Sequence, residues 1–114
     1  MDALMMPAEP LSPNRFHILA ALAGRDLHGS GVARDVLDQT DGVLRLWPAT
    51  LYGALDDLER EGLIEELAGA SRPEGASERR RYYRITAEGR CALAAEAGRL
   101  DRVAGIARER LGHA

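Results

Sequence analysis

The chain of 114 residues has a single cysteine, no lysine, few aromatic residues (4%) and no long apolar run. One cysteine, Cys91, cannot form a disulfide within the chain or build a cysteine-based zinc cluster. No apolar stretch is long enough to span a bilayer, and the first ten residues lack the basic start and apolar stretch of a secretory signal. We therefore expect a cytoplasmic protein with no membrane partner and a core of Leu, Ala, Val and Ile.

Motifs of catalytic chemistry are also missing. The three histidines, His17, His28 and His113, have no spacing suited to a metal ion, and neither GxxxxGK[ST] nor GxGxxG occurs. Cys91 would be either a redox-sensing thiol or a buried small hydrophobe, and we expect the second, because free cysteine is among the most buried residue types. The sequence thus predicts no enzyme, no metal and no cofactor.

Charge is distributed unevenly along a chain whose net charge is −3. Residues 69–90 hold six arginines and three acids, whereas residues 41–68 hold two arginines and seven acids. Positive charge therefore gathers between Arg72 and Arg90. The absence of lysine is compatible with a GC-rich coding genome as well as with selection for bidentate phosphate contacts.

Capping residues and hydrophobic periodicity divide the chain into helices and strands. Ser12-Pro13, Ser30, Pro48 and Thr86 are typical helix starts, and apolar residues at three- and four-residue spacing follow each of them. The predicted elements are helices over 12–24, 30–41, 48–62 and 87–111, a β-prone segment 43–46, strands 63–68 and 81–85, and a flexible loop over 69–78. The predicted buried faces carry Phe16, Leu19, Ala20 and Ala23; Val32, Val36 and Leu37; and Leu51, Leu55 and Leu58.

This order of elements predicts a mainly α fold with a small two-stranded β-wing, which is a winged helix-turn-helix. We expect a flexible N-terminal arm (1–11), a winged-helix DNA-binding domain (12–86) and a C-terminal dimerisation helix (87–114).

The third helix is the candidate for the major groove of duplex DNA. With Leu51, Leu55 and Leu58 turned to the core, its outward N-terminal end carries small or uncharged residues and the positive end of the helix dipole. These residues are Ala49, Thr50, Tyr52 and Gly53. The acids of the helix lie in its C-terminal half, away from the phosphates.

The predicted wing carries Arg79, Arg80 and Arg81 at the base of its second strand. Such arginines neutralise phosphates and release counterions. The alternative is a solvated hairpin edge whose charges discourage edge pairing, and the preceding helix-turn-helix favours the wing. We also count Ser30 and Arg34 of the second helix among the candidate DNA contacts.

Several segments together resemble one family of bacterial transcriptional regulators. They are HGSG at 28–31, PATLYGAL at 48–55, LEREGLI at 58–64, and RRRYYRIT at 79–86 with Gly89. These segments, between Phe16 and Leu93, are similar to the PadR family, with P-x-T-L-Y and the R-Y-Y-x-[IL]-T strand as the most specific parts. The resemblance implies a homodimeric repressor-type regulator, with Thr50 and Tyr52 as groove or phosphate contacts and the arginines near Arg80 as wing contacts.

Two residues depart from the family pattern. Ser30 stands where the family often has Tyr, and Trp47 stands where it usually has a small polar residue before the proline. Trp47 cannot cap the third helix through a side-chain oxygen. It either fills the core beneath the helix or lines a ligand pocket, and we expect the first, because large apolar residues usually fill interiors.

The last helix carries a heptad-like apolar stripe, widened by Val103 and Ile106. The helix either folds back on its own domain or pairs with a second copy, and the width of the arc favours a dimer. The candidate dimerisation residues are Leu93, Ala97, Leu100, Ala104, Ala107 and Leu111.

Two further functions compete with DNA binding. A winged helix that docks on another protein would suit the acidic total and the acids of the third helix. An effector-gated sensor would bind a small molecule between the last helix and the DNA-binding domain. The sequence therefore predicts operator DNA and a second copy as partners, with a small-molecule effector as a further possibility.

Overall fold

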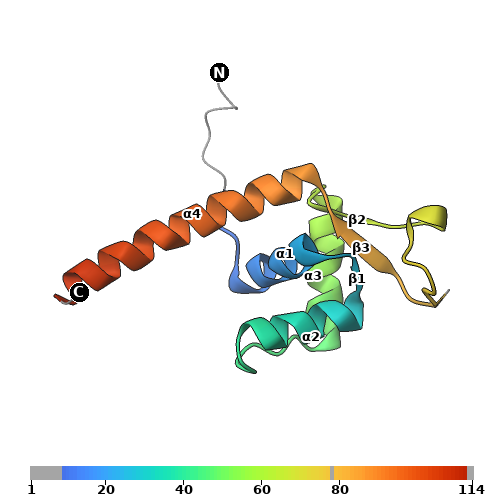
Figure 1. Ribbon diagram of the computed structural model, residues 1–114, viewed down its shortest axis with the longest axis horizontal. Helices are drawn as coiled ribbons and strands as arrows, with labels where there is room; N and C mark the ends of the chain where they lie inside the picture. The colour runs from blue at the N-terminus through green and yellow to red at the C-terminus, as the bar shows by residue number, and fades with distance from the viewer. Residues whose placement is uncertain (1–8, 78, 113–114) are drawn as a thin grey trace, which may run out of the picture.

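Four α-helices and a three-stranded sheet make up the computed structural model, which describes residues 9–77 and 79–112. The sheet is antiparallel with the order β1-β3-β2. In Figure 1 the β2–β3 hairpin extends to one side of the body and α4 to the other. The elements are α1 (Pro13–Gly24), β1 (Leu27–His28), α2 (Gly29–Gln39), α3 (Pro48–Arg60), β2 (Ile64–Glu66), the 3-10 turn η2 (Gly69–Ser71), β3 (Tyr82–Ile85) and α4 (Ala87–Arg110).

The mainly α fold with a β-wing is confirmed, and the sheet has one strand more than predicted. β1 is only two residues long and pairs with β3, Leu27 opposite Tyr83 and His28 opposite Tyr82. A two-residue strand has no alternation to detect, which explains why the sequence pattern did not predict it. None of the helices in the described ranges is long and apolar enough to cross a membrane.

The helix starts follow the capping residues, with one exception. Ser12 Oγ accepts from the Arg15 N–H (3.3 Å), and Thr86 Oγ1 accepts from the Gly89 N–H (3.0 Å), as predicted. The predicted cap of α2 by Ser30 is wrong, because α2 begins at Gly29 and His28 is its N-cap. Since β1 ends at His28, the helix starts directly after the strand, and the imidazole supplies the acceptor.

The core lies where α1, α2, α3 and the sheet meet. Val32, Val36, Leu51, Leu55 and Leu58 are buried as predicted. The predicted face of α1 is partly wrong: Leu19 is buried, but Phe16, Ala20 and Ala23 are half-buried. The buried residues of α1 are Ile18, Leu19, Ala21 and Leu22. Because α1 packs against α2, α4 and β3 at once, its buried arc differs from the single stripe that periodicity suggests.

The β-prone segment 43–46 forms no strand. Its backbone has no neighbouring strand to pair with, although its side chains still alternate: Leu44 is half-buried and Leu46 buried, whereas Val43 and Arg45 are exposed. The pattern thus identified an extended segment correctly but not its pairing.

Two arginines of the basic segment hold the wing together. Arg72 donates through Nη2 to the Arg80 carbonyl (2.7 Å) and to the Ser77 carbonyl, and its guanidinium lies over the Tyr82 ring. Arg84 forms a two-point ion pair with Asp26, at 2.8 and 3.2 Å. These guanidinium groups order the hairpin and its junction with α1, so the wing arginines left for a ligand are those of the run 79–81.

α4 packs on the body through its first half and projects from it through the second (Figure 1). Glu96, buried although charged, accepts from the Leu11 N–H (3.2 Å) and pairs with Arg99. The Arg99 guanidinium holds the pKa of Glu96 below its usual value. Residues 1–8 of the expected N-terminal arm lie outside the described ranges, and Leu11 packs against the core.

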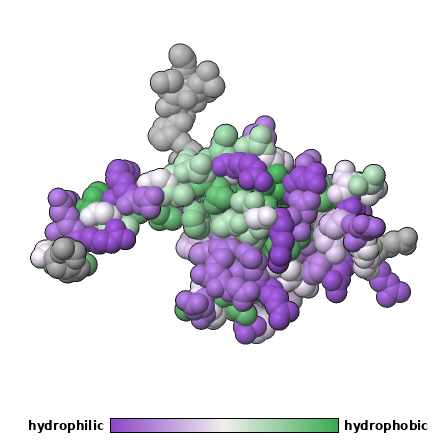
Figure 2. All heavy atoms as spheres, viewed as in Figure 1, coloured by the Kyte–Doolittle hydropathy of each residue, from purple (hydrophilic) through white to green (hydrophobic). Residues whose placement is uncertain are grey.

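Cys91 is exposed on α4, so the expectation of a buried small hydrophobe is wrong for the single chain. It lies beside Ala92 and Ala95 on a shallow apolar surface at the base of the helix. Figure 2 shows that hydrophobic side chains gather along this part of α4.

Gly89 packs tightly against the residue before β2 and against the end of β3. A Cβ at this position would lie 2.1 Å from the Leu63 carbonyl oxygen and 2.7 Å from Ile85 Cγ1, whereas nothing lies within 4 Å of a Cβ at Gly98 in the same helix. We expect Gly89→Ala to lower the free energy of unfolding by about 2 kcal/mol, since backbone must move. Gly98→Ala should raise it by up to about 1 kcal/mol through helix propensity. Urea unfolding of both variants tests this, and equal effects would contradict the packing described.

Candidate nucleic-acid interface

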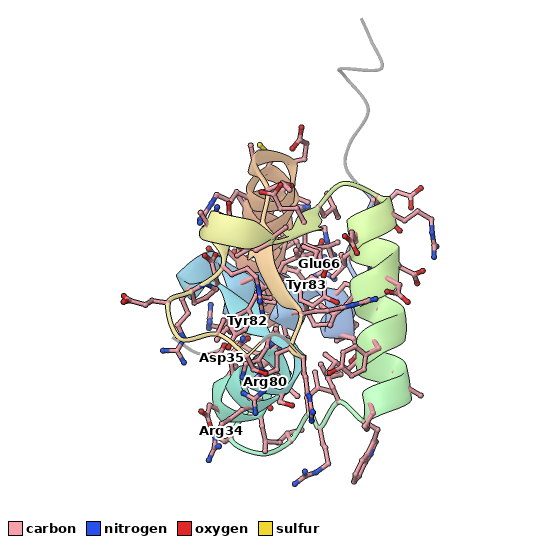
Figure 3. The ribbon with its side chains drawn as sticks, turned by 90° about the vertical axis from the view of Figure 1, so that its right-hand side faces the viewer. Arg34, Asp35, Glu66, Arg80, Tyr82 and Tyr83 are labelled. Carbon is pink, nitrogen blue, oxygen red and sulfur yellow. The ribbon has the colours of Figure 1, made fainter. Side chains whose placement is uncertain are left out.

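A notch of about 290 Å³ opens between the start of α2, the outer face of α3 and the base of the wing. It brings together residues that are far apart in the chain and that the sequence singled out separately. In Figure 3 the labelled Arg80 lies in front of α2, with Tyr82 above it and Arg34 below. The notch is lined by His28, Gly29, Ser30, Tyr52, Arg79, Arg80 and Arg81.

His28 joins the helix start to the wing. Its Nδ1 accepts from the Gly31 N–H (3.0 Å), and its ring packs edge-on against Tyr82. Because Nδ1 is an acceptor, the neutral ring carries its proton on Nε2. That nitrogen lies 2.8 Å from Arg80 Nη1, which can only donate. Both nitrogens are then donors, so the imidazole does not satisfy this guanidinium donor.

Burial, and after it the charge of Arg80, lowers the pKa of His28 below its ordinary value. The ring is therefore neutral at pH 7 and remains an acceptor for the helix. Protonation would remove that acceptor and place a second cation beside Arg80 and at the positive end of the α2 dipole.

Tyr52 lies directly over the first residue of α2. A Cβ built on Gly29 would come within 2.5 Å of the Tyr52 hydroxyl and 2.8 Å of its Cζ, so the ring occupies the space that a larger side chain would need. Glycine here allows the α3 side chain to reach across to α2. The tyrosine remains 44% exposed, and it lines the notch.

The other predicted residues of α3 also face outward. Ala49, Thr50 and Gly53 are exposed, whereas Leu51 and Leu55 are buried. The N-terminal end of α3 therefore presents small, uncharged side chains beside the basic notch. Asp56 and Asp57 follow on the same helix, further from its N-terminus.

The three wing arginines have different neighbours. Arg80 contacts His28, and Arg81 forms a long ion pair with Glu66 (3.9 Å), a solvent-exposed arrangement of low strength. The Tyr83 hydroxyl and the Glu66 carboxylate raise the pKa of Arg81. Figure 3 shows Tyr83 and Glu66 close to each other on the α3 side of the hairpin. Arg79 and Arg80 are consequently the cations most available to a ligand.

Arg34 lies outside the notch, in a second hollow of about 360 Å³ that contains Ser30, Asp38 and Arg45. Ser30 lines both hollows, so the start of α2 connects them. The predicted contacts thus form one continuous surface rather than one pocket.

The expectation that Trp47 fills the core is wrong. Its side chain is 65% exposed, and the Arg45 guanidinium stacks over its ring at 5.4 Å. The buried place beneath α3 is taken by Leu46, the preceding residue. Because side chains alternate along this extended segment, one of the two must face outward.

Sequence reasoning missed three elements of this surface: the capping role of His28, the ordering role of Arg72 and the outward position of Trp47. Only the last had a usable signal, which is the alternation over 43–47. Among residues 9–77 and 79–112, no group of three or more His, Cys, Asp or Glu side chains is placed to hold a metal ion.

Three helices, the third with an exposed N-terminal end, followed by a hairpin with a basic base, define the winged helix-turn-helix class. Residues 18–95 match the model of the Transcriptional regulator PadR-like family. The chain therefore belongs to the PadR-like family of transcriptional regulators, whose members are regulators rather than enzymes.

Two solved structures share this fold, and a further relative is similar in sequence. A transcriptional regulator of Clostridium thermocellum is 27% identical, with a TM-score of 0.69 over 84% of this chain and 87% of that one. A PadR family transcription regulator of Clostridium difficile, 24% identical, has the same fold, with a TM-score of 0.72 over 89% of this chain and all of the other. An uncharacterized protein of Lysinibacillus sphaericus is 30% identical over 76 residues, 67% of each chain.

The cap of α2 gives a test with a defined pH dependence. Since folding lowers the pKa of His28, its contribution to stability is complete above about pH 6.5, the ordinary value, and is lost as the pH falls through the folded-state pKa. His28→Asn keeps a good N-cap, and we expect it to lack this acid-dependent loss. His28→Ala should lower the free energy of unfolding by about 1 kcal/mol at pH 8. Unfolding at pH 8, 6 and 5 measures both effects, and identical pH profiles for the wild type and His28→Asn would contradict the assignment.

Proposed function

We propose that the protein is a homodimeric, sequence-specific DNA-binding regulator, of repressor type, that seats the N-terminal end of α3 in the major groove. The observation that chiefly supports this proposal is the notch. Within it, the tyrosine of α3, the start of α2 and the wing arginines face one space, as a phosphate beside the groove would require.

A net charge of −3 argues against DNA binding, but the local distribution of charge favours it. The proposed DNA side presents Arg79, Arg80 and the uncharged start of α3. Asp57 lies further along the helix, and Asp56, one turn after Tyr52, is near enough to Arg81 to act on its charge. Phosphate contacts supply most of the sequence-independent affinity of a DNA-binding protein, so the placement of cations matters more than their sum. Because the proposed ligand is chromosomal DNA, the proposed site of action is the cytoplasm.

The wing arginines give the first test of DNA binding. Replacing Arg79, Arg80 and Arg81 together by Ala should weaken binding to the DNA flanking the protein's own gene. It should also reduce the slope of log K against log salt by about 0.9 for each phosphate that is no longer neutralised. Gel shifts or fluorescence anisotropy at several salt concentrations measure both quantities.

A charge-matched control triple removes Arg60, Arg90 and Arg110, which are exposed on α3 and α4 outside the proposed surface. We expect it to leave the slope unchanged. Equal salt slopes for the wild type and the wing triple would exclude the wing role. Failure of the wild type to bind DNA at any salt concentration would favour the competing role, a winged helix that docks on a protein through the acids of α3.

Dimerisation through α4 is the second part of the proposal. Its projecting half carries apolar side chains that remain exposed in the single chain: Leu100 (40% exposed), Val103 (44%), Ile106 (36%) and Leu111 (70%). Ala97 and Ala107 are also exposed, Ala104 is half-buried, and Leu93 packs partly against its own core. A helical end without tertiary contacts is marginal in water, so a second copy would stabilise it.

Charge placed on this stripe should separate the subunits. We expect Leu100→Glu and Ile106→Glu, alone and combined, to shift the protein from dimer to monomer at micromolar concentration, because a carboxylate would be buried without a partner. Val43→Glu is the matched control, since Val43 is an exposed apolar residue far from α4 along the chain. Analytical ultracentrifugation distinguishes the two species. A monomeric wild type would remove the dimer from the proposal.

A small-molecule effector has weaker support. The hollow beside α4, lined by Glu96, Arg99 and Arg102 among others, measures about 380 Å³. Its buried carboxylate already pairs with Arg99 and accepts from Leu11. The one buried polar group of the hollow is therefore occupied, and DNA with a second copy remain the proposed partners.

A further inference from the structure

The segment between α2 and α3 presents an apolar and cationic edge that the proposed interface does not use. Val43 is 85% exposed, Trp47 is 65% exposed, and Arg45 lies exposed between them, all on the outer side of the extended segment. Leu44 and Leu46 alternate with them on the inner side and pack on the core. The outward side chains are therefore held by buried neighbours.

The backbone of this segment is fixed at its start. Thr40 Oγ1 donates to the Val36 carbonyl (3.0 Å) and accepts from the Leu44 N–H (2.9 Å). Asp41 and Gly42 turn the chain with positive φ angles of 52° and 83°. Gly42 N–H also donates to the Leu37 carbonyl (2.8 Å). Trp47 thus stands on an ordered loop, and its exposure is a property of the fold.

Trp47 and Arg45 are paired with each other. The guanidinium lies 5.4 Å from the ring centroid, which is a cation–π contact that limits the freedom of both side chains. Arginine side chains bind DNA phosphates, and apolar side chains contact the thymine methyl group in the major groove. A preordered pair loses less entropy on binding than two free side chains would.

The position of the pair indicates which partner it meets. Trp47 is the N-cap of α3, immediately before Pro48, so it stands beside the helix end proposed to enter the groove. Arg45 shares its hollow with Arg34, where Asp38 is the one acid among the lining residues. Ser30 connects this hollow to the basic notch. The surroundings are continuous with the proposed DNA surface and carry its sign of charge.

We propose that Trp47 and Arg45 form a second contact with duplex DNA at the entrance of α3. The indole would cover the apolar edge of a nucleotide, a sugar or a thymine methyl, and the Arg45 guanidinium would bind the adjacent phosphate. This inference rests on the proposed DNA-binding function and extends the contact surface from the wing, across α2, to the loop before α3.

Trp47 is the only tryptophan of the chain, so the tryptophan fluorescence of the protein reports directly on the surroundings of this side chain. We expect its fluorescence to change on titration with the DNA flanking the protein's own gene, and its quenching by acrylamide to fall in the complex. Trp47→Ala should weaken binding by about tenfold, the effect of losing partial burial of a large side chain, and leave the salt slope unchanged. Trp47→Phe should retain most of the affinity.

Arg45→Ala should show the complementary behaviour. It removes one phosphate contact per subunit, so affinity and the salt slope should both fall, the slope by about 0.9 per contact. Arg60→Ala is the matched control, because Arg60 is an exposed arginine at the opposite end of α3. Since Trp47 and Arg45 are exposed, these variants should keep the circular dichroism spectrum and unfolding midpoint of the wild type.

The outcomes separate this inference from the function it rests on. If the wild type binds DNA with a salt slope that depends on the wing, but Trp47 keeps its free-state quenching and Trp47→Ala binds as tightly as the wild type, the second contact is wrong and the proposed function stands. If the wild type binds no DNA, both are wrong.

Discussion

The pairing of β1 with β3 is the contact on which the rest of the surface depends. Two residues of β1 fix the end of α1 and the start of α2 against the wing. Through this pairing His28 both caps α2 and lies against Tyr82 and Arg80. The Arg84–Asp26 ion pair ties the same strand to the end of α1. Without β1 the hairpin would still contact α1, α3 and α4 through its own strands, but nothing would hold the wing arginines beside the first turn of α2.

This arrangement explains how an acidic chain presents a basic surface. Arg72 and Arg84 are used to order the wing, Arg99 neutralises the buried Glu96, and Arg15 pairs with Glu61. Among the arginines that face outward, those at the base of the wing lie beside the edge formed by Arg34 and Arg45. Net charge is therefore a poor guide to the partner of this protein. The distribution along the sequence located the wing, but only the folded structure distinguishes arginines that hold the hairpin from those that face outward.

The sequence specified most of the fold because its signals were local. Ser12, Pro48 and Thr86 define helix starts by their own chemistry, and Leu51, Leu55 and Leu58 define a buried face by spacing alone. The errors concern features that depend on distant residues. His28 caps α2 because β1, which pairs with β3, ends at this residue. The ion pair between Asp26 and Arg84 likewise depends on the β1–β3 pairing. Glu96 is buried because the chain before α1 returns to α4, which no local pattern records.

The start of α3 has an aromatic residue, Trp47, at the position where a polar N-cap is usual. Among the four α-helices of the described region, α1, α2 and α4 have a side-chain cap and α3 has none, because Trp47 occupies the capping position. Pro48 removes one of the unpaired N–H groups, and the Leu51 N–H is bonded to the Trp47 carbonyl (2.8 Å), which leaves the donors of Ala49 and Thr50 for solvent or a ligand. A polar cap would have contributed about 1 kcal/mol to stability. This stabilisation is absent at the N-terminal end of α3, which the proposed function directs toward DNA. An aromatic ring, Trp47, and a guanidinium, Arg45, lie at that helix end instead.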